Sequence, residues 1–200
     1  MKKIYIILTH TGTILSKIIK KYTKDEFSHV SISLDVDLKE MYSFGRLNPY
    51  NALWAGFIHE YIDKGTFKRF YKTKAKIYSL EITEEQYENV KSNIERIKRD
   101  KKDYKFNMLG LLAVGFNKKI RKEHSFYCAE FIKYVLENSG IKVELPEIVK
   151  PEDFKKIRGL QEIYSGLLRK YRAPKINVTK LFREICIPKK EGIIWVEKVK

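Results

Sequence analysis

The chain has 200 residues, of which 44% are hydrophobic and 13% aromatic, so it can bury a substantial core and is not a disordered tail. Lys and Arg number 41 against 25 Asp and Glu, and the resulting net charge of +16 raises the question of a polyanionic partner. Only nine of the 41 are Arg, and the Lys residues are spread along the whole chain. We therefore interpret the charge as a lysine-rich solvated surface and do not expect nucleic acid as the partner.

Cysteine and histidine usage excludes a disulfide framework and shows no metal-binding pattern. Cys128 and Cys186 are the two cysteines, and the four histidines form no HExxH or similar ligand pair, so we expect neither a metal nor a cofactor. The apolar run at 4–8 is too short for a signal peptide, and no window approaches the roughly 20 apolar residues of a membrane span. The sequence predicts a cytoplasmic protein with reduced thiols, and peripheral membrane association is the alternative.

The pattern in the first half predicts a sheet. Strands are expected at 4–9, 28–35, 40–45 and 74–82, the second and third forming a hairpin, whereas 46–65 reads as irregular. A helix is expected to begin at Thr11-Gly12-Thr13 and to end near Tyr22. The strand at 28–35 alternates strictly, with small polar residues on one face and apolar ones on the other: His29, Ser31 and Ser33 against Val30, Ile32 and Leu34.

The second half is predicted to be mainly helical. Thr83 and Gln86 form a capping box that opens a helix to about Lys102, and Ser125 is expected to cap a helix over 126–139 that ends at Gly140. Residues 109–116 are either a short buried helix or the wall of an acyl-binding cleft. A helical stretch from Pro151 to about Tyr171, broken near Gly159, and a closing strand at 193–199 complete the prediction of one α+β domain over residues 1–200.

Cys128 and His29 are the candidate reactive groups. Behind a Ser125 cap, Cys128 lies in the first turn of a helix, where backbone N–H groups and the helix dipole favour the thiolate and can bind an oxyanion. His29 lies on the small polar face of its strand, which suits a cleft, and an imidazole there could accept the thiol proton. Each residue also has a purely structural alternative: Cys128 as a cysteine buried by packing, and His29 as an ordinary histidine of a strand.

Taken together, the two residues resemble the circularly permuted papain-like amidases. These are relatives of the NlpC-type cysteine peptidases and of the lecithin:retinol acyltransferase group, in which the histidine strand precedes the cysteine helix. The matching pieces are THTGTILSKIIKKYTKDEFSHVSISLD, FYCAEFIKYVLENSG and the Pro-Glu-Asp-Phe segment at 151–154. Ala129 stands where this family frequently has Ser. The resemblance implies a papain-like antiparallel sheet packed against helices.

The resemblance also implies roles for individual residues. It assigns Cys128 as nucleophile and His29 as general base, and it places a third, imidazole-orienting residue on the strand after the histidine strand. By offset Ser43 is the nearest match there, whereas Glu40 is the better hydrogen-bond acceptor, so both remain candidates. His124 is a rival base that reads better as a loop residue beside the site. Glu60 and Arg46 are interpreted as surface residues or structural ion-pair partners.

The expected function is a cysteine hydrolase that cleaves an amide or ester bond through an acyl-enzyme on Cys128. Its expected partner is a peptide, amide or acyl-lipid substrate, and an anionic membrane surface is considered as a second partner. The alternatives are a lipid acyltransferase or thioesterase-like member of the same superfamily, a nucleic-acid-binding protein and a catalytically inactive binding module. The sequence does not indicate an oligomeric state.

Overall fold

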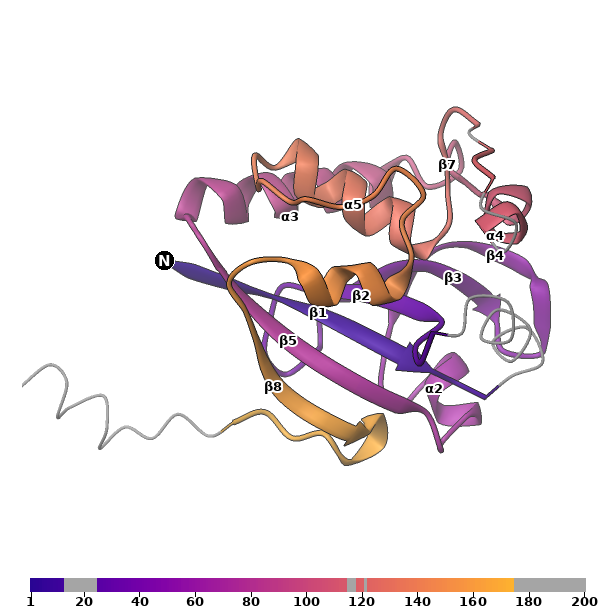
Figure 1. Cartoon of the computed structure of the whole chain (residues 1–200). Helices are drawn as coiled ribbons and strands as arrows, with labels where there is room; N and C mark the ends of the chain where they lie inside the picture. Colours follow the sequence, from indigo (N-terminus) through magenta and orange to yellow (C-terminus); the bar gives the residue numbers. More distant parts are fainter. Residues whose placement is uncertain (13–24, 115–117, 121, 175–200) are drawn as a thin grey trace, which may run out of the picture.

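The fold is built on a six-stranded antiparallel sheet in the order β4-β3-β2-β1-β5-β8 (Figure 1). The computed structural model describes residues 1–12, 25–114, 118–120 and 122–174. The strands are β1 Lys2–His10, β2 His29–Ser33, β3 Met41–Asn48, β4 Asn51–Glu60, β5 Lys74–Ile82 and β8 Leu160–Leu167. Residues 4–8 of β1 are almost fully buried, because β1 lies in the middle of the sheet with side chains packed on both faces. The α+β class predicted from the sequence is confirmed.

Two helices cover one face of the sheet. Helices α3 (Glu84–Arg99) and α5 (Cys128–Asn138) lie side by side above it, and α5 contacts β2 and β3 (Figure 1). Both are amphipathic, and their apolar faces join the main core through Val90, Ile94, Ile97, Phe131, Ile132 and Val135. The sequence therefore predicted the presence of both helices correctly, because each has a strong apolar stripe.

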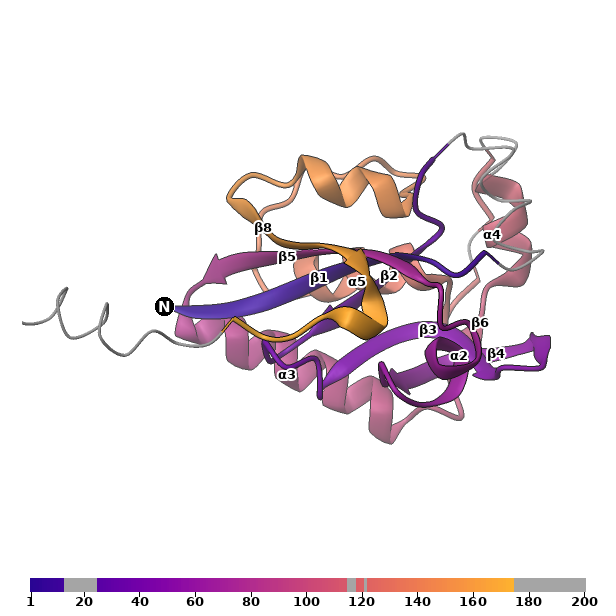
Figure 2. The same cartoon turned by 90° about the horizontal axis from the view of Figure 1, so that it is seen from below.

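Smaller elements complete the structure. The other face of the sheet carries a second, smaller core around Met41, Phe67 and Tyr171, in which the short α2 (Gly65–Arg69) takes part (Figure 2). Helix α4 (Met108–Val114) lies beside a two-stranded parallel ribbon of β6 (Lys105–Phe106) and β7 (Ser125–Phe126). No helix in the part of the chain that the structure describes is long and apolar enough to cross a bilayer.

Three predicted boundaries are wrong. Residues 46–65, expected to be irregular, hold the end of β3 and all of β4, an edge strand whose mostly accessible side chains leave no alternating pattern. Only Pro151–Lys156 is helical in the last stretch, as a 3₁₀ turn, and β8 follows at the opposite edge of the sheet before a second 3₁₀ turn, Leu168–Lys170. The cap of α5 is Tyr127, not Ser125, which belongs to β7. The helix predicted from Thr11 to Tyr22 and the strand at 193–199 lie outside the described residues, apart from Thr11 and Gly12.

The capping box of α3 provides a test of local stability. Thr83 Oγ1 accepts a hydrogen bond from the Gln86 amide at 3.1 Å, and Gln86 Oε1 accepts one from the Thr83 amide at 3.0 Å. Thr83→Ala removes the first bond and is expected to lower the free energy of unfolding by about 1 kcal/mol in urea titrations. Ser92→Ala, on an exposed position inside the same helix, is the control and should change stability little. An equal effect of both variants would contradict the capping role.

Candidate active site

Cys128 is the first residue of α5 and lies at the bottom of a cleft, with only 4% of its surface exposed. The carboxylate of Glu130, in the first turn of α5, accepts a hydrogen bond from the Tyr127 amide at 3.1 Å. A carboxylate at this position satisfies one of the amides that a helix start leaves without a partner. The beginning of the helix, and with it the Cys128 sulfur, is therefore held in a defined position.

Asn107 fixes the same helix start from the neighbouring segment. Its side-chain amide donates to Glu130 at 3.3 Å and to the Ile120 carbonyl at 2.8 Å, and its own backbone amide donates to the Phe126 carbonyl at 2.9 Å. Its side-chain oxygen accepts from the Gly110 amide at 2.8 Å, which attaches the first turn of α4. Asn107 is 2% exposed, so this network joins α4, β7 and α5 inside the protein.

His29, the first residue of β2, is paired with the carboxylate of Glu60 at the end of β4. The distance from His29 Nε2 to Glu60 Oε1 is 3.0 Å, and the two side chains are only 19% and 7% exposed. Ser31 Oγ donates to the other oxygen of the same carboxylate at 2.5 Å. Both oxygens of a buried carboxylate are thus hydrogen-bonded, as a charge in this position requires.

The imidazole of His29 lies close enough to Cys128 for the two side chains to influence each other, and both line the same cleft. Glu60 engages Nε2, so Nδ1 is the ring nitrogen that this carboxylate leaves available. Burial by itself lowers the pKa of His29, but the charge of Glu60, the hydrogen bond with Glu60 and the neighbouring Cys128 side chain outweigh it and raise the pKa to about 10. A thiol, an imidazole that holds a proton and a carboxylate therefore line one cleft, and we call Cys128, His29 and Glu60 the row.

The third residue of this row is not one of the two expected from the sequence. The Ser43 hydroxyl is used elsewhere, since Oγ donates to the Val30 carbonyl at 2.7 Å. Glu40 is an exposed residue in the turn before β3. Beside the imidazole, β3 instead presents Gly45, where a Cβ atom would lie 3.3 Å from His29 Cε1 and 3.5 Å from Glu60 Oε1. The small residue leaves room for Glu60 to reach the imidazole from the next strand.

The remaining candidates occupy different positions. His124 is exposed and its ring lies 5.3 Å from that of Tyr104, away from the cleft lining. Arg46 lines the cleft, and its pKa is lowered by burial and by the charge of Arg69. Cys186 lies outside the described residues. Glu60 is correctly an ion-pair partner but is buried in the cleft, so the expectation of a surface role is wrong.

The cleft that contains the row has a volume of about 80 Å³ and is lined by both polar and apolar groups. Cys128, His29 and Glu60 form its reactive part, and aromatic and aliphatic side chains form much of the rest, namely Phe44, Phe67, Phe106 and Leu111. Leu111 belongs to α4, whose described residues pack against the main core through Val114 and contribute Leu111 to the cleft, and the acyl-binding role considered for this stretch stays a prediction. Among the described residues, no group of three or more His, Cys, Asp or Glu side chains is arranged to hold a metal ion.

Comparisons with known proteins add a similarity of fold and no match in sequence. No protein-family profile matches the chain, and no curated protein matches it in sequence. Among solved structures, the chain resembles the crystal structure described as that of the metalloprotein yiiX from Escherichia coli O157:H7. That similarity has a TM-score of 0.49 at 16% sequence identity, and it covers 82% of this chain and 97% of the other.

The pairing of His29 with Glu60 predicts a specific pH dependence of stability. The raised pKa means that the folded protein keeps the imidazole proton up to about pH 10, whereas the unfolded chain releases it near its ordinary value of about 6.5. The stabilisation is therefore complete below that ordinary value and is lost as the pH rises toward 10. Glu60→Gln should lower the His29 pKa, measured by NMR titration, and flatten the decline in unfolding free energy over this range.

Glu81→Gln is the control for this experiment, because Glu81 loses the same charge in an exposed pair with Lys3. It should leave the His29 titration in place. An unchanged His29 midpoint in Glu60→Gln would contradict the pairing seen in the structure.

Gly45 provides a second test, with a matched control on the facing strand. Gly45→Ala is expected to push against the His29–Glu60 pair and to slow alkylation of Cys128 by iodoacetamide. Gly56 faces Gly45 across β3 and β4, and its added methyl group would meet Leu47 at the same distance of 3.3 Å. Leu47 is exposed and can move, so Gly56→Ala should keep the wild-type alkylation rate. Equal rates in the two variants would show that Gly45 has no special role beside the imidazole.

Proposed function

We propose that the protein is a cysteine hydrolase that cleaves an amide or ester bond through an acyl-enzyme on Cys128. The observation that carries the proposal is the row of Cys128, His29 and Glu60 around one cleft, with the imidazole hydrogen-bonded to Glu60 and influenced by the neighbouring Cys128 side chain. A nucleophile, a base in contact with it and a third group that orients the base are the parts that nucleophilic catalysis needs. Glu60 is the orienting group in this proposal and takes the place considered for Ser43 or Glu40.

The chemistry follows from the positions of these groups. The Cys128 thiolate attacks the carbonyl carbon of the substrate, and the resulting oxyanion is stabilised by N–H groups at the start of α5. The His29 imidazolium gives its proton to the departing amine or alcohol as the C–N or C–O bond breaks, which leaves a thioester on Cys128. The neutral imidazole then takes a proton from water as the water attacks the thioester, and the thiolate is released with the proton back on His29.

Glu60 contributes as a positioning residue. Its carboxylate holds the imidazole through Nε2, so that Nδ1 stays directed at the sulfur, and it stabilises the positive charge of the imidazolium. The donation from Ser31 Oγ fixes the carboxylate in turn. The order of the parts along the chain, with the histidine strand before the cysteine helix, matches the permuted papain-like amidases that the sequence resembles.

A second candidate is an acyltransferase or thioesterase-like activity on lipid-linked acyl groups. The apolar side chains of Phe44, Phe106 and Leu111 along the cleft favour it, because they could hold an acyl chain next to the sulfur. The first half of the reaction is the same, and an alcohol or amine in place of water would accept the acyl group. Product analysis with and without added acceptor alcohols separates the two activities.

The proposal is tested by labelling with an acyl or alkylating active-site probe. The wild-type protein and Cys186→Ala should react, whereas Cys128→Ala should not. His29→Asn should retain the thiol but react about 100-fold or more slowly, because the imidazolium that stabilises the thiolate is lost. Equal labelling of Cys128→Ala and Cys186→Ala would overturn the assignment of the nucleophile.

A further inference from the structure

Large apolar side chains are exposed at the tip of the hairpin formed by β3 and β4. Leu53 is 82% exposed, Tyr50 80% and Trp54 59%, and Leu47 beside them is also exposed. Leu109 and Leu112 of α4 are exposed as well. We call these six residues the rim surface. Isolated exposed apolar residues are ordinary, but a group of this kind that includes Trp and Tyr indicates an interaction site.

The rim surface borders the cleft that contains Cys128. Ala52 and Ala55 line the cleft from β4, and Leu111 lines it from α4. In the sequence, these residues are direct or near neighbours of Leu53, Trp54, Leu109 and Leu112 of the rim surface. The rim surface therefore belongs to the two elements, β4 and α4, that also contribute side chains to the cleft, and Figures 1 and 2 draw these elements at the same end of the molecule.

Basic side chains accompany the rim surface. Residues 46–72 contain five Lys and Arg against two Asp and Glu, and one of those two is Glu60, which is buried against His29. Arg69 stacks on the ring of Tyr50 at 3.9 Å and donates to the Pro49 carbonyl at 2.8 Å. Among the described residues, Lys64, Lys68, Arg69 and Lys72 take part in no ion pair with an acidic side chain. Residues 105–123 add five Lys and Arg against one Glu.

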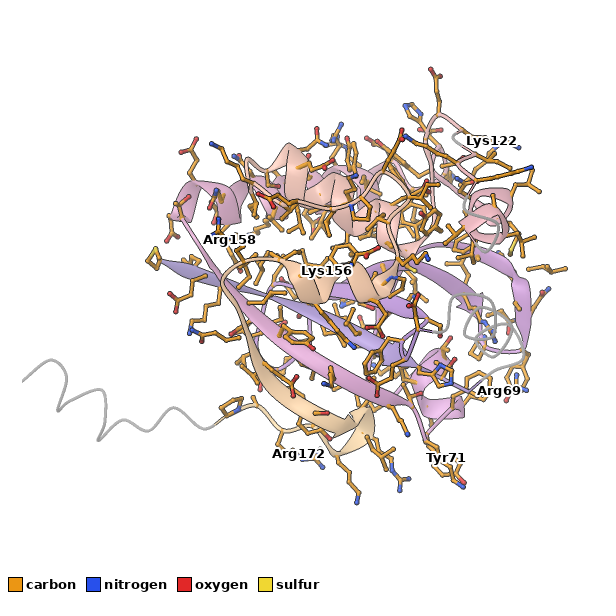
Figure 3. All side chains as sticks on the ribbon, viewed as in Figure 1. Arg69, Tyr71, Lys122, Lys156, Arg158 and Arg172 are labelled. Carbon is orange, nitrogen blue, oxygen red and sulfur yellow. The ribbon has the colours of Figure 1, made fainter. Side chains whose placement is uncertain are left out.

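We propose that the rim surface docks on anionic lipid bilayers. Trp and Tyr prefer the interface between water and hydrocarbon, Leu53 and Trp54 gain by leaving water, and each nearby Lys or Arg is attracted by anionic headgroups. Figure 3 shows Arg69 and Lys122 at the end of the molecule that carries the hairpin and α4, whereas Arg158 and Arg172 lie away from it. The tip belongs to an edge strand, whose outward-facing backbone N–H and C=O groups have no strand partner among the described residues and cannot enter the hydrocarbon. Insertion is therefore shallow and involves only side chains.

Docking in this orientation brings the cleft entrance against the membrane. If Cys128 acts as proposed above, its substrate in this orientation is an amphipathic molecule that presents its amide or ester bond at the bilayer surface. This inference rests on the proposed function. The binding itself is independent of the chemistry, so the two proposals can fail separately.

Flotation of the full chain with vesicles tests the docking. The wild-type protein should float with phosphatidylcholine vesicles that contain phosphatidylserine, bind weakly to phosphatidylcholine alone, and be released by salt. The double variant Leu53→Ser and Trp54→Ser should lose about tenfold or more of its affinity, because the inserting side chains are gone. Arg69→Glu should weaken binding several-fold more than Arg158→Glu, an equal change of charge on an exposed residue away from the rim surface.

Fluorescence reports the inserted residue directly. In a protein in which Trp195 is replaced by Phe, Trp54 is the single tryptophan, and its emission should shift to the blue and be quenched by brominated lipid on vesicle binding. Loss of binding in the double variant with unchanged probe labelling of Cys128 would show that docking and chemistry are separate, as proposed.

Three results would overturn the docking. The first is equal flotation of the wild-type protein and the double variant. The second is blue-shifted Trp54 emission without vesicles, which would mean that another part of the chain already covers it. The third is a dimer in sedimentation velocity that the double variant dissolves, which would make a second copy the occupant of the rim surface. Docking that persists when Cys128 cannot be labelled would overturn only the proposed function.

Discussion

The arrangement of the site depends on one buried ion pair, between His29 on β2 and Glu60 on β4. A carboxylate in a buried position is costly unless its oxygens are hydrogen-bonded, and here the imidazole and the Ser31 hydroxyl meet that requirement. The pair spans the strand between its two members, so it forms only if β2, β3 and β4 keep their register and if β3 has a small residue at Gly45. The geometry of the sheet and the chemistry of the imidazole are thus set by the same contacts.

The thiol is brought to this pair by packing of the core. Helix α5 lies across β2 and β3, and Phe131 on its buried face contacts the rings of Phe44 and Phe57 at centroid distances of 5.3 and 5.7 Å. These contacts fix the height and direction of the helix over the sheet, since aromatic side chains in a dense core tolerate little displacement. Glu130 and Asn107 then determine where the first turn begins, and therefore where the sulfur of Cys128 lies.

The sequence predicted those parts that carry strong periodic or capping signals. The alternation at 28–35 and the apolar stripe of α5 were sufficient to place His29 on a strand and Cys128 at a helix start. The third residue could not be found in this way, because hairpin register is not visible in the sequence and β4 is an edge strand without a clear alternation. A signal for the cap of α5 was present, since Glu130 stands three residues after Tyr127, as an N3 carboxylate does.

Strand β4, which the sequence did not predict, connects the cleft with the exposed tip of the hairpin. Strand β4 ends at Glu60, which lines the cleft, and begins next to the exposed tip, and as an edge strand it pairs within the six-stranded sheet with β3. A slip of one residue along β3 would turn the carboxylate to the other face and away from the imidazole. The pairing is regular from Met41 to Arg46 and shifts only between Arg46 and Asn48. This irregularity separates the tip from the regular pairing, so side chains at the tip can adjust to a partner while Glu60 keeps its place beside His29.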